Sequence, residues 1–272
     1  AASDVYKRQL LRNDDRSKIS KRKNPVSLIW YKEEGYLKEG LVNFLGLMGY
    51  SYGDGQEIFS LQEFKDNFNI DKVTLGGPVF DLVKLGWVNN QHMKMKDLGE
   101  LTRLTIPFFV QEGYFENENV SEKEFETLKK IVAIEREGAK TLKEIAKNSK
   151  FFFIDEFTLP EVKEDMDKKE RKSIEKLLNS LQDEVGLKAI KLLIDKLEKW
   201  ESNEFTAEEA KDLLHSLLDD LQEGPGKVFM PIRAVLTGEP KGADLYNVLY
   251  VIGKERALKR IKDTVKKYNI QL

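Results

Sequence analysis

The sequence lacks cysteine entirely and holds only two histidines in 272 residues. The absence of thiols excludes disulfide scaffolds, zinc–thiolate sites and cysteine nucleophiles. His92 and His215 lie far apart in the sequence, and neither has a second histidine nearby, so we expect no protein-bound metal. His215 lies among leucines and is expected at the edge of a helical core, whereas His92 is expected on the surface.

Long hydrophobic runs are also missing. No stretch approaches the roughly twenty apolar residues that a membrane-spanning helix needs, and the first residues do not form a signal peptide. An apolar content of 40% in 272 residues suffices for one or two cores. We therefore expect a soluble, cytoplasmic protein with more than one domain and no membrane partner.

A large net charge is absent, because 45 basic residues face 47 acidic ones. The charges are unevenly spread, however: residues 1–30 carry a net charge of +5, residues 224–272 carry +6, and the residues between them carry −13. Basic segments in a soluble protein favour a polyanion partner such as a nucleic acid. The alternative is that these lysines and arginines only solvate helix faces and a loop.

Helical periodicity dominates the chain after residue 25. Apolar residues at three- and four-residue spacing predict helices over 26–34, 37–49, 78–95, 121–137, 140–148, 167–183, 186–199, 206–222, 227–237, 243–252 and 254–267. Pro78 suits the first turn of the third helix. Strands and helices do not alternate, so no complete nucleotide-binding sheet domain is expected. The predicted fold class is mainly α.

The run 151–154 (FFFI) predicts either a short strand or an aromatic plug. Its phenylalanines could pack inward or stack on bases of a nucleic acid, and the sequence leaves both alternatives open. Weak domain boundaries are predicted near Leu98 and within 155–165, where the apolar period is interrupted.

The sharpest local pattern is the basic run 16–23 (RSKISKRK). Lys18 and Lys21, separated by two small or apolar residues on a loop, can reach a triphosphate from one side. An ammonium group held against phosphate oxygens stabilises the charge that develops when pyrophosphate leaves an α-phosphate. The alternative is an ordinary basic linker, because short basic runs are common.

With its flanking residues 11–25, this run resembles the signature (KMSKS-type) loop of class I aminoacyl-tRNA synthetases, and in particular of bacterial-type glutamyl-tRNA synthetases. Further blocks resemble the same family in the same order: 30–37 (WYKEEGYL), 43–51 (NFLGLMGYS), 75–81 (LGGPVFD), 84–89 (KLGWVN), 236–238 (LTG) and 248–260 (VLYVIGKERALKR). The resemblance extends from about residue 10 to residue 261.

The resemblance implies a remnant of the catalytic-domain signature loop with a helical stem-contact domain at 10–97, and an all-helical anticodon-binding region with subdomains at 98–158 and 159–272. Residues 1–9 do not resemble the family and are interpreted as a non-native or remnant leader. The family's Rossmann-type catalytic domain has no counterpart here. We therefore interpret the chain as the C-terminal half of such an enzyme and expect it to be inactive alone.

The resemblance also implies the ligands. The parent enzyme activates L-glutamate with ATP, accompanied by Mg²⁺, and transfers it to the tRNA for glutamate. Lys21 is implied as the lysine that contacts ATP, with Lys18, Ser20 and Arg22 shaping the loop around it. We expect the protein to be a monomer.

Candidate tRNA contacts fall at several matched positions. Lys84 and Trp87 lie in a block of the stem-contact domain, with core packing as the alternative for Trp87. Family members that reject the tRNA for glutamine carry an arginine that reads the third anticodon base, and the alignment puts Gly138 there, or Arg136 if the register slips. Glycine lacks the bidentate contacts to base edges that arginine makes. We therefore hypothesise that the tRNA for glutamine is accepted as well.

The basic C-terminal helix, expected from residue 254 onward, offers a second candidate surface. Arg256, Lys259 and Arg260, together with Lys267, could contact phosphates. The alternative is a solvated helix whose cations lie favourably near its C-terminal dipole.

Two other functional classes compete with the synthetase interpretation. One is a stand-alone tRNA-binding module, and the other is a helical protein-interaction scaffold. A tRNA-binding module has no use for an ATP-contacting lysine pair, and a scaffold does not explain the order of the matched blocks. The sequence therefore favours the synthetase.

Overall fold

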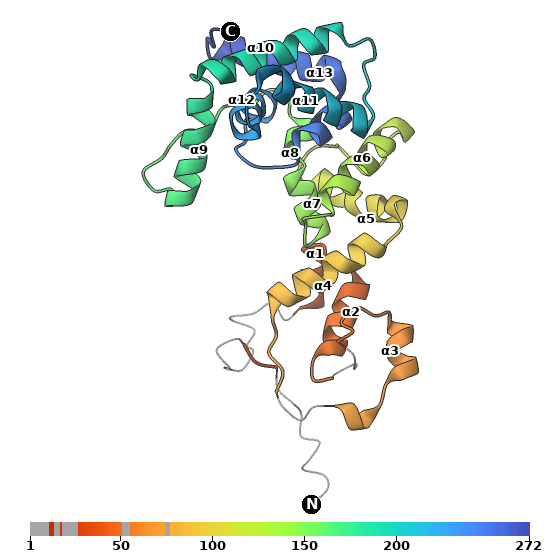
Figure 1. The fold of residues 1–272 in the computed structure, drawn as a ribbon. Helices are drawn as coiled ribbons and strands as arrows, with labels where there is room; N and C mark the ends of the chain where they lie inside the picture. Colours follow the sequence, from red (N-terminus) through yellow and green to blue (C-terminus); the bar gives the residue numbers. More distant parts are fainter. Residues whose placement is uncertain (1–10, 14–16, 18–26, 51–54, 74–76) are drawn as a thin grey trace, which may run out of the picture. The chain divides into compact units, whose positions relative to one another are not determined.

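The computed structural model describes residues 11–13, 17, 27–50, 55–73 and 77–272 (Figure 1). Within these ranges the regular secondary structure is helical, apart from two isolated β-bridges, Arg12–Val79 and Tyr50–Val73. The prediction of a mainly α fold is confirmed. The chain divides into two compact units, Ala1–Lys147 and Asn148–Leu272. The four-part division drawn from the sequence stays a prediction.

The first unit is built from short and medium-length helices with polar caps. They are α1 (Leu28–Glu33), α2 (Lys38–Leu47), α3 (Leu61–Asn67), the 3-10 helix η2 (Ile70–Lys72), α4 (Leu82–Met95), α5 (Leu98–Gln111), α6 (Glu122–Glu135) and α7 (Leu142–Asn148). Asp81 starts α4, because its side chain accepts hydrogen bonds from the first free backbone N–H groups of the helix. Ser121 and Glu124 form a capping box that starts α6.

Helix α4 is central to the first unit. Tyr31 of α1, Phe44 of α2, and Leu85 and Val88 of α4 form a buried core cluster. Helix α2 packs along α4, and α5 packs on α6. The position of α4 is therefore fixed by burial of its apolar stripe.

Helix α5 departs from the sequence analysis, which assigned no helix to residues 98–111. Pro107 lies inside it, and an interior proline removes one helical hydrogen bond. Leu101 and Phe109 are fully buried, so tertiary packing stabilises the helix in spite of the proline. The predicted helix 78–95 ends as expected but begins at Leu82, so Pro78 lies outside its first turn.

The second unit is organised around α12. Its helices are α8 (Lys150–Phe153), α9 (Lys168–Ser180), α10 (Glu184–Lys199), α11 (Ala207–Leu221), α12 (Pro225–Thr237) and α13 (Leu245–Lys267). Helix α12 contacts α9, α10, α11 and α13. Its residues Val228, Ile232 and Val235 have no exposed surface, so this helix forms the centre of the core.

The phenylalanine run 151–153 forms α8 rather than a strand. Phe151 and Phe152 are buried, with ring centroids 4.3 Å apart. Of the two alternatives, inward packing is therefore correct for these two rings, and they are not available to stack on bases.

Helix α13 changes direction at Gly253, which adopts a left-handed conformation with φ of 74°. A Cβ atom at this position would lie 2.7 Å from the carbonyl oxygen of Asn203. Asn203 accepts hydrogen bonds from the backbone N–H groups of Lys254 and Glu255, at 2.8 and 2.9 Å. The predicted separation of 243–252 from 254–267 is confirmed. None of the helices described here has the length and hydropathy of a membrane-spanning segment.

Candidate nucleic-acid interface

The signature-loop residues Lys18, Ser20, Lys21 and Arg22 lie outside the described residues. The segment that leads into the loop is described at Arg12. Its N–H donates to the carbonyl oxygen of Pro78 at 3.0 Å, and its carbonyl oxygen accepts from the N–H of Phe80 at 2.8 Å. These two hydrogen bonds attach the approach to the loop to the segment that leads into α4.

Lys84 and Trp87 lie one turn apart on α4. The Lys84 ammonium nitrogen is 4.2 Å from the centre of the Trp87 ring, which is a cation–π contact. It also pairs with the carboxylate of Glu57. The Trp87 residue is 41% exposed, so the alternative of ordinary core packing is wrong. The pair forms a partly exposed, cationic and aromatic surface of the kind that contacts nucleic acid.

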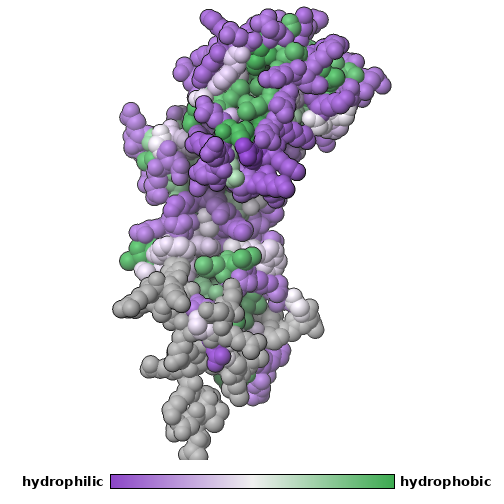
Figure 2. Space-filling view, turned by 90° about the vertical axis from the view of Figure 1, so that its left-hand side faces the viewer, coloured by the Kyte–Doolittle hydropathy of each residue, from purple (hydrophilic) through white to green (hydrophobic). Residues whose placement is uncertain are grey.

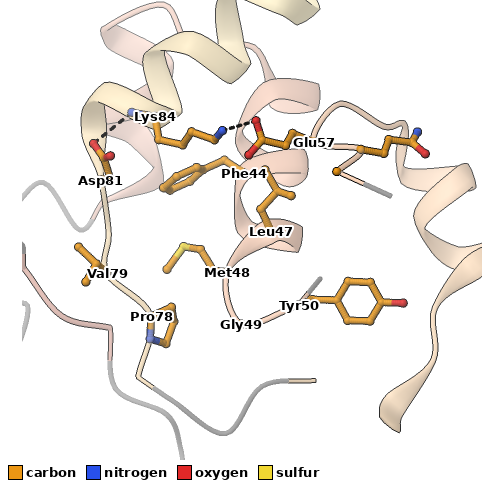
Figure 3. Close-up of a pocket in the computed structure, with 12 residues that line it drawn as sticks. Phe44, Leu47, Met48, Gly49, Tyr50, Glu57, Pro78, Val79, Asp81 and Lys84 are labelled. Carbon is orange, nitrogen blue, oxygen red and sulfur yellow. Dashed lines mark hydrogen bonds and ion pairs between the residues drawn. The ribbon is translucent and has the colours of Figure 1, made fainter. Parts of the chain in front are cut away.

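A cavity of about 390 Å³ lies beside Lys84 (Figure 3). Apolar side chains form much of its wall, and the Lys84–Glu57 pair and Asp81 line its rim; the other lining residues include Phe44, Leu47, Met48, Tyr50, Pro78 and Val79. The Asp81 side chain is committed to the start of α4 through its hydrogen bonds to the backbone. The cavity therefore presents an apolar interior behind a charged rim.

The turn between α6 and α7, residues 136–140, contains Gly138 and Arg136, the two positions that the resemblance offers for the anticodon-reading residue. The Asn90 side chain of α4 donates to the carbonyl oxygens of Arg136 and Ala139, at 2.8 and 2.7 Å. The neighbouring Asn89 donates to the carbonyl oxygen of Lys140 at 2.7 Å and accepts from the N–H of Leu37 at 2.8 Å. The turn is thus bound to α4 through three of its backbone carbonyl oxygens.

Within this turn, Gly138 and Arg136 have different surroundings. Gly138 is exposed, and a Cβ atom built there would meet nothing within 4 Å. The Arg136 side chain is only 23% exposed and lies 3.8 Å from the carboxylate of Glu137, while its Nε is buried without a hydrogen-bond partner. Position 138 can therefore present a side chain outward more readily than position 136.

Glu135 ends α6 directly before the turn. Its side chain is buried, and its Oε1 has no hydrogen-bond partner. Burial raises the pKa of Glu135 to about 7. This buried carboxyl group directly precedes the turn that Asn89 and Asn90 of α4 hold by hydrogen bonds.

The C-terminal helix contradicts part of the predicted phosphate-contacting surface. The Arg260 side chain is 1% exposed, and its Nη1 donates to the carbonyl oxygen of Phe151 at 2.6 Å. Its Nε donates to Asp155 Oδ1 at 3.0 Å. Arg260 is thus an internal tie between α13 and α8, and the prediction that it lies on a phosphate-contacting surface is wrong, because its charge cannot reach solvent.

Arg256 is largely committed to the same carboxylate. Its Nε and Nη2 donate to Asp155 Oδ1 at 3.1 and 2.8 Å, and Nη2 also donates to the carbonyl oxygen of Phe152. Burial raises the pKa of Asp155, but the hydrogen bonds and charges of the two arginines outweigh it and hold the pKa below its ordinary value of 3.8. Lys259, by contrast, is exposed and remains a candidate contact.

The two histidines take positions other than those expected. His92 is buried, and its Nε2 lies 2.8 Å from Asn43 Oδ1, so the expected surface position is wrong. His215 is exposed rather than at a core edge. Among the described residues, no group of three or more acidic or histidine side chains is placed to hold a metal ion.

The face of the second unit seen in Figure 2 is mostly hydrophilic, with hydrophobic residues gathered in its middle.

Comparison with known protein families assigns both parts of the chain. The model of an anticodon binding domain matches residues 100–265. The model of the catalytic domain of class I tRNA synthetases (E and Q) matches residues 2–87. A glutamate–tRNA ligase from Fusobacterium nucleatum is 90% identical over 261 residues. The chain belongs to the glutamate–tRNA ligase family. The resemblance noted from the sequence is confirmed.

Other members of the family match over the same extent. A glutamate–tRNA ligase from Thermus thermophilus is 37% identical over 263 residues, which cover 96% of this chain and 51% of that relative. The Fusobacterium match covers the same two shares. A crystal structure of a glutamate tRNA ligase from Elizabethkingia meningosepticum in complex with its amino acid superimposes with a TM-score of 0.73 at 26% identity, covering 96% of this chain and 50% of that one. The chain thus spans about half the length of the family members it matches.

Proposed function

We propose that the chain is the tRNA-binding part of a glutamate–tRNA ligase, an enzyme that activates L-glutamate with ATP and transfers it to tRNA. The observation that carries the proposal is the order of the two family matches: a class I catalytic match over residues 2–87 is followed by an anticodon-binding match over residues 100–265. A stand-alone RNA-binding module or an interaction scaffold does not explain the first match. The same family membership supports a monomer that works in the cytoplasm.

The contribution to ATP chemistry rests on the signature loop. Lys21 is the proposed ATP contact, and Lys18, Ser20 and Arg22 shape the loop. A lysine ammonium group aimed at the phosphates stabilises the charge that develops on the leaving pyrophosphate, and Mg²⁺ accompanies the ATP. Arg12 supports this role, because its two backbone hydrogen bonds attach the approach to the loop to the segment before α4.

Recognition of tRNA is proposed at two places in the first unit. Lys84 and Trp87 offer a cation and an exposed aromatic face for the stem. The turn containing Gly138 is proposed to lie at the third anticodon base. Because Gly138 has no side chain to hydrogen-bond with a base edge, we propose that the chain accepts the tRNAs for both glutamate and glutamine. Lys259 is proposed as an additional phosphate contact.

Direct binding measurements test the proposal. Binding of the chain to the tRNAs for glutamate, glutamine and a third amino acid is measured at two salt concentrations. We expect the first two to bind with similar affinity and more tightly than the third, with affinities that fall as salt rises. Equal binding of all three would overturn anticodon recognition, and rejection of the glutamine tRNA would overturn the role of Gly138.

A substitution tests the assignment of position 138. Gly138→Arg fits sterically, because a Cβ atom there meets nothing within 4 Å. It should favour the glutamate tRNA over the glutamine tRNA by about tenfold, the discrimination that one good bidentate contact supplies. Gly138→Lys is the matched control, because it adds the same charge without the planar fork. Equal effects of the two substitutions would contradict base reading at this position.

Catalysis by the chain alone is tested separately. We expect no ATP–pyrophosphate exchange, because the chain spans about half the length of the ligases it matches. Exchange above a Lys21→Ala control would refute this expectation.

A further inference from the structure

One face of α4, beside the residues that form its core, contacts the turn 136–140. Gly86, Asn89 and Asn90 lie at helical positions i, i+3 and i+4 and therefore share one face of the helix. Asn89 and Asn90 hold three carbonyl oxygens of the turn. A Cβ atom at Gly86 would lie 2.9 Å from Cδ of Lys140, so the glycine leaves room for the turn to lie against the helix.

The same helix carries Lys84 and Trp87, and these positions do not belong to the Gly86–Asn90 face. One rigid element thus bears the proposed stem contacts and the anchors of the proposed anticodon-contacting turn. An α-helix rises about 1.5 Å per residue, so the six residues from Lys84 to Asn90 fix an axial separation of about 9 Å. A flexible loop could not hold that spacing.

We propose that Asn90, supported by Asn89, is a positioning residue for tRNA recognition: it fixes the turn 136–140 relative to α4, so that position 138 lies at the third anticodon base while Lys84 and Trp87 contact the stem. The inference rests on the proposed function. Asn90 acts through the turn and does not itself touch the tRNA. Its side-chain amide donates both of its hydrogens to the turn, at 2.8 and 2.7 Å.

Backbone hydrogen bonds at the turn add to the hydrogen bonds that Asn90 donates to it. The N–H of Ala139 donates to the carbonyl oxygen of Glu135, and the N–H of Leu142 donates to that of Gly35, both at 3.0 Å. The carbonyl oxygens of Arg136 and Ala139 receive their side-chain hydrogen bonds from the Asn90 donors. Loss of those donors should therefore loosen the turn locally.

The first arm of the test is hydrogen exchange of the full chain without RNA. In Asn90→Ala, the amides of Ala139 and Leu142 should exchange about tenfold faster, because two hydrogen bonds of the turn are lost. Asn43→Ala is the control: Asn43 is another side-chain amide of this unit whose partners, the backbone of Glu57 and Phe59 and the ring of His92, lie outside the turn. Unchanged exchange in the turn of Asn90→Ala would overturn the proposal.

The second arm measures base discrimination in the Gly138→Arg background. Two tRNAs that differ only in the third anticodon base are compared. The ratio of their Kd values, about tenfold for Gly138→Arg, should fall to within about twofold of unity when Asn90→Ala is added, and should persist when Asn43→Ala is added. A merely structural role of Asn90 would weaken both tRNAs equally and leave the ratio unchanged.

The outcomes distinguish a failure of the positioning role of Asn90 from a failure of the proposed function. A ratio that survives Asn90→Ala overturns the positioning role and leaves the proposed function intact. If Gly138→Arg alone binds the two tRNAs with equal Kd values, the assignment of position 138 is overturned, together with the positioning role that rests on it. Asn90→Ser keeps one donor and should give intermediate exchange and an intermediate ratio, which retains a test if Asn90→Ala does not fold.

Discussion

Removal of the Asp155 carboxylate should destabilise the second unit much more than removal of an exposed carboxylate that also pairs with α13. Asp155 Oδ1 accepts hydrogen bonds from Arg256 and from Arg260. The Arg260 side chain is 1% exposed, so in Asp155→Ala a guanidinium charge stays buried with only carbonyl oxygens around it. An arginine does not escape by deprotonation, because its pKa is too high.

The magnitude follows from this burial. Breaking a buried ion pair by removing one partner costs about 3–5 kcal/mol, and the lower end applies here because Asp155 itself is 38% exposed. Glu198→Ala is the control, since its pair with Lys262 is about half exposed on both sides. Such a surface pair contributes about 0.5 kcal/mol or less. We therefore expect a difference of at least about 2 kcal/mol between the two variants.

Hydrogen exchange followed by mass spectrometry in increasing urea measures the effect, because peptides of α12 and α13 are read separately from those of α4. The midpoint for α12 and α13 should shift in Asp155→Ala, while that of α4 stays. A loss in Asp155→Ala no larger than in Glu198→Ala would refute the reasoning that Arg260 depends on this carboxylate.

The pH dependence provides a second check of the same cluster. The pKa of Asp155 is held below its ordinary value of 3.8 in the folded chain. The unfolded chain therefore binds the proton more readily, and the stabilisation is complete above about pH 4 and lost as the pH falls through the folded pKa. The difference between wild type and Asp155→Ala should be constant at neutral pH and shrink only in acid.

Three further predictions concern other positions. Gly253→Ala should lower the free energy of unfolding by at least about 1 kcal/mol, because its φ is 74° and the new Cβ would meet a carbonyl oxygen; Gly138→Ala, with open space around it, should cost less than half as much in the same urea titration. The free energy of unfolding of Glu135→Gln should rise relative to that of the wild type between about pH 5 and pH 7, by up to about 3 kcal/mol. The reason is that burial raises the pKa of Glu135 to about 7, so the wild type loses stability over this range, where the carboxyl group ionises more readily in the unfolded chain. A difference between the two proteins that does not change with pH over this range would contradict the raised pKa of Glu135. Trp87→Leu should weaken binding to every tRNA by about fivefold or more without changing the ratio between the glutamate and glutamine tRNAs, because a lost stacking face does not read bases; a changed ratio in filter binding would argue against a stem contact.

Much of the fold follows from the sequence because long helices such as α10 and α11 bury apolar residues at three- and four-residue spacing. The apolar period places α6, α10 and α11 to within a few residues, and Gly253 correctly separates the halves of α13. Helix α5 is not predicted, because Pro107 weakens the local signal and the helix depends on burial of its side chains.

The candidate site is less accessible to sequence reasoning. A lysine or arginine in a basic helix has the same pattern whether it faces solvent or an internal partner. Arg256 and Arg260 meet Asp155 across 101 and 105 residues of sequence, and no local period reveals such a pair. The hydrogen bonds of Asn90 to the turn cannot be predicted from the sequence for the same reason, since their acceptors lie 46 and 49 residues away.

The hydrogen bonds between Asn203 and the second half of α13 limit which changes of sequence the second unit tolerates. The two N–H groups that begin this half are satisfied by a residue about fifty positions earlier, so the helix takes its starting point from the loop between α10 and α11. An insertion or deletion in that loop would shift the start of the helix and rotate every side chain after it by about 100° per residue. The loop, although exposed, should therefore keep its length while its other residues vary.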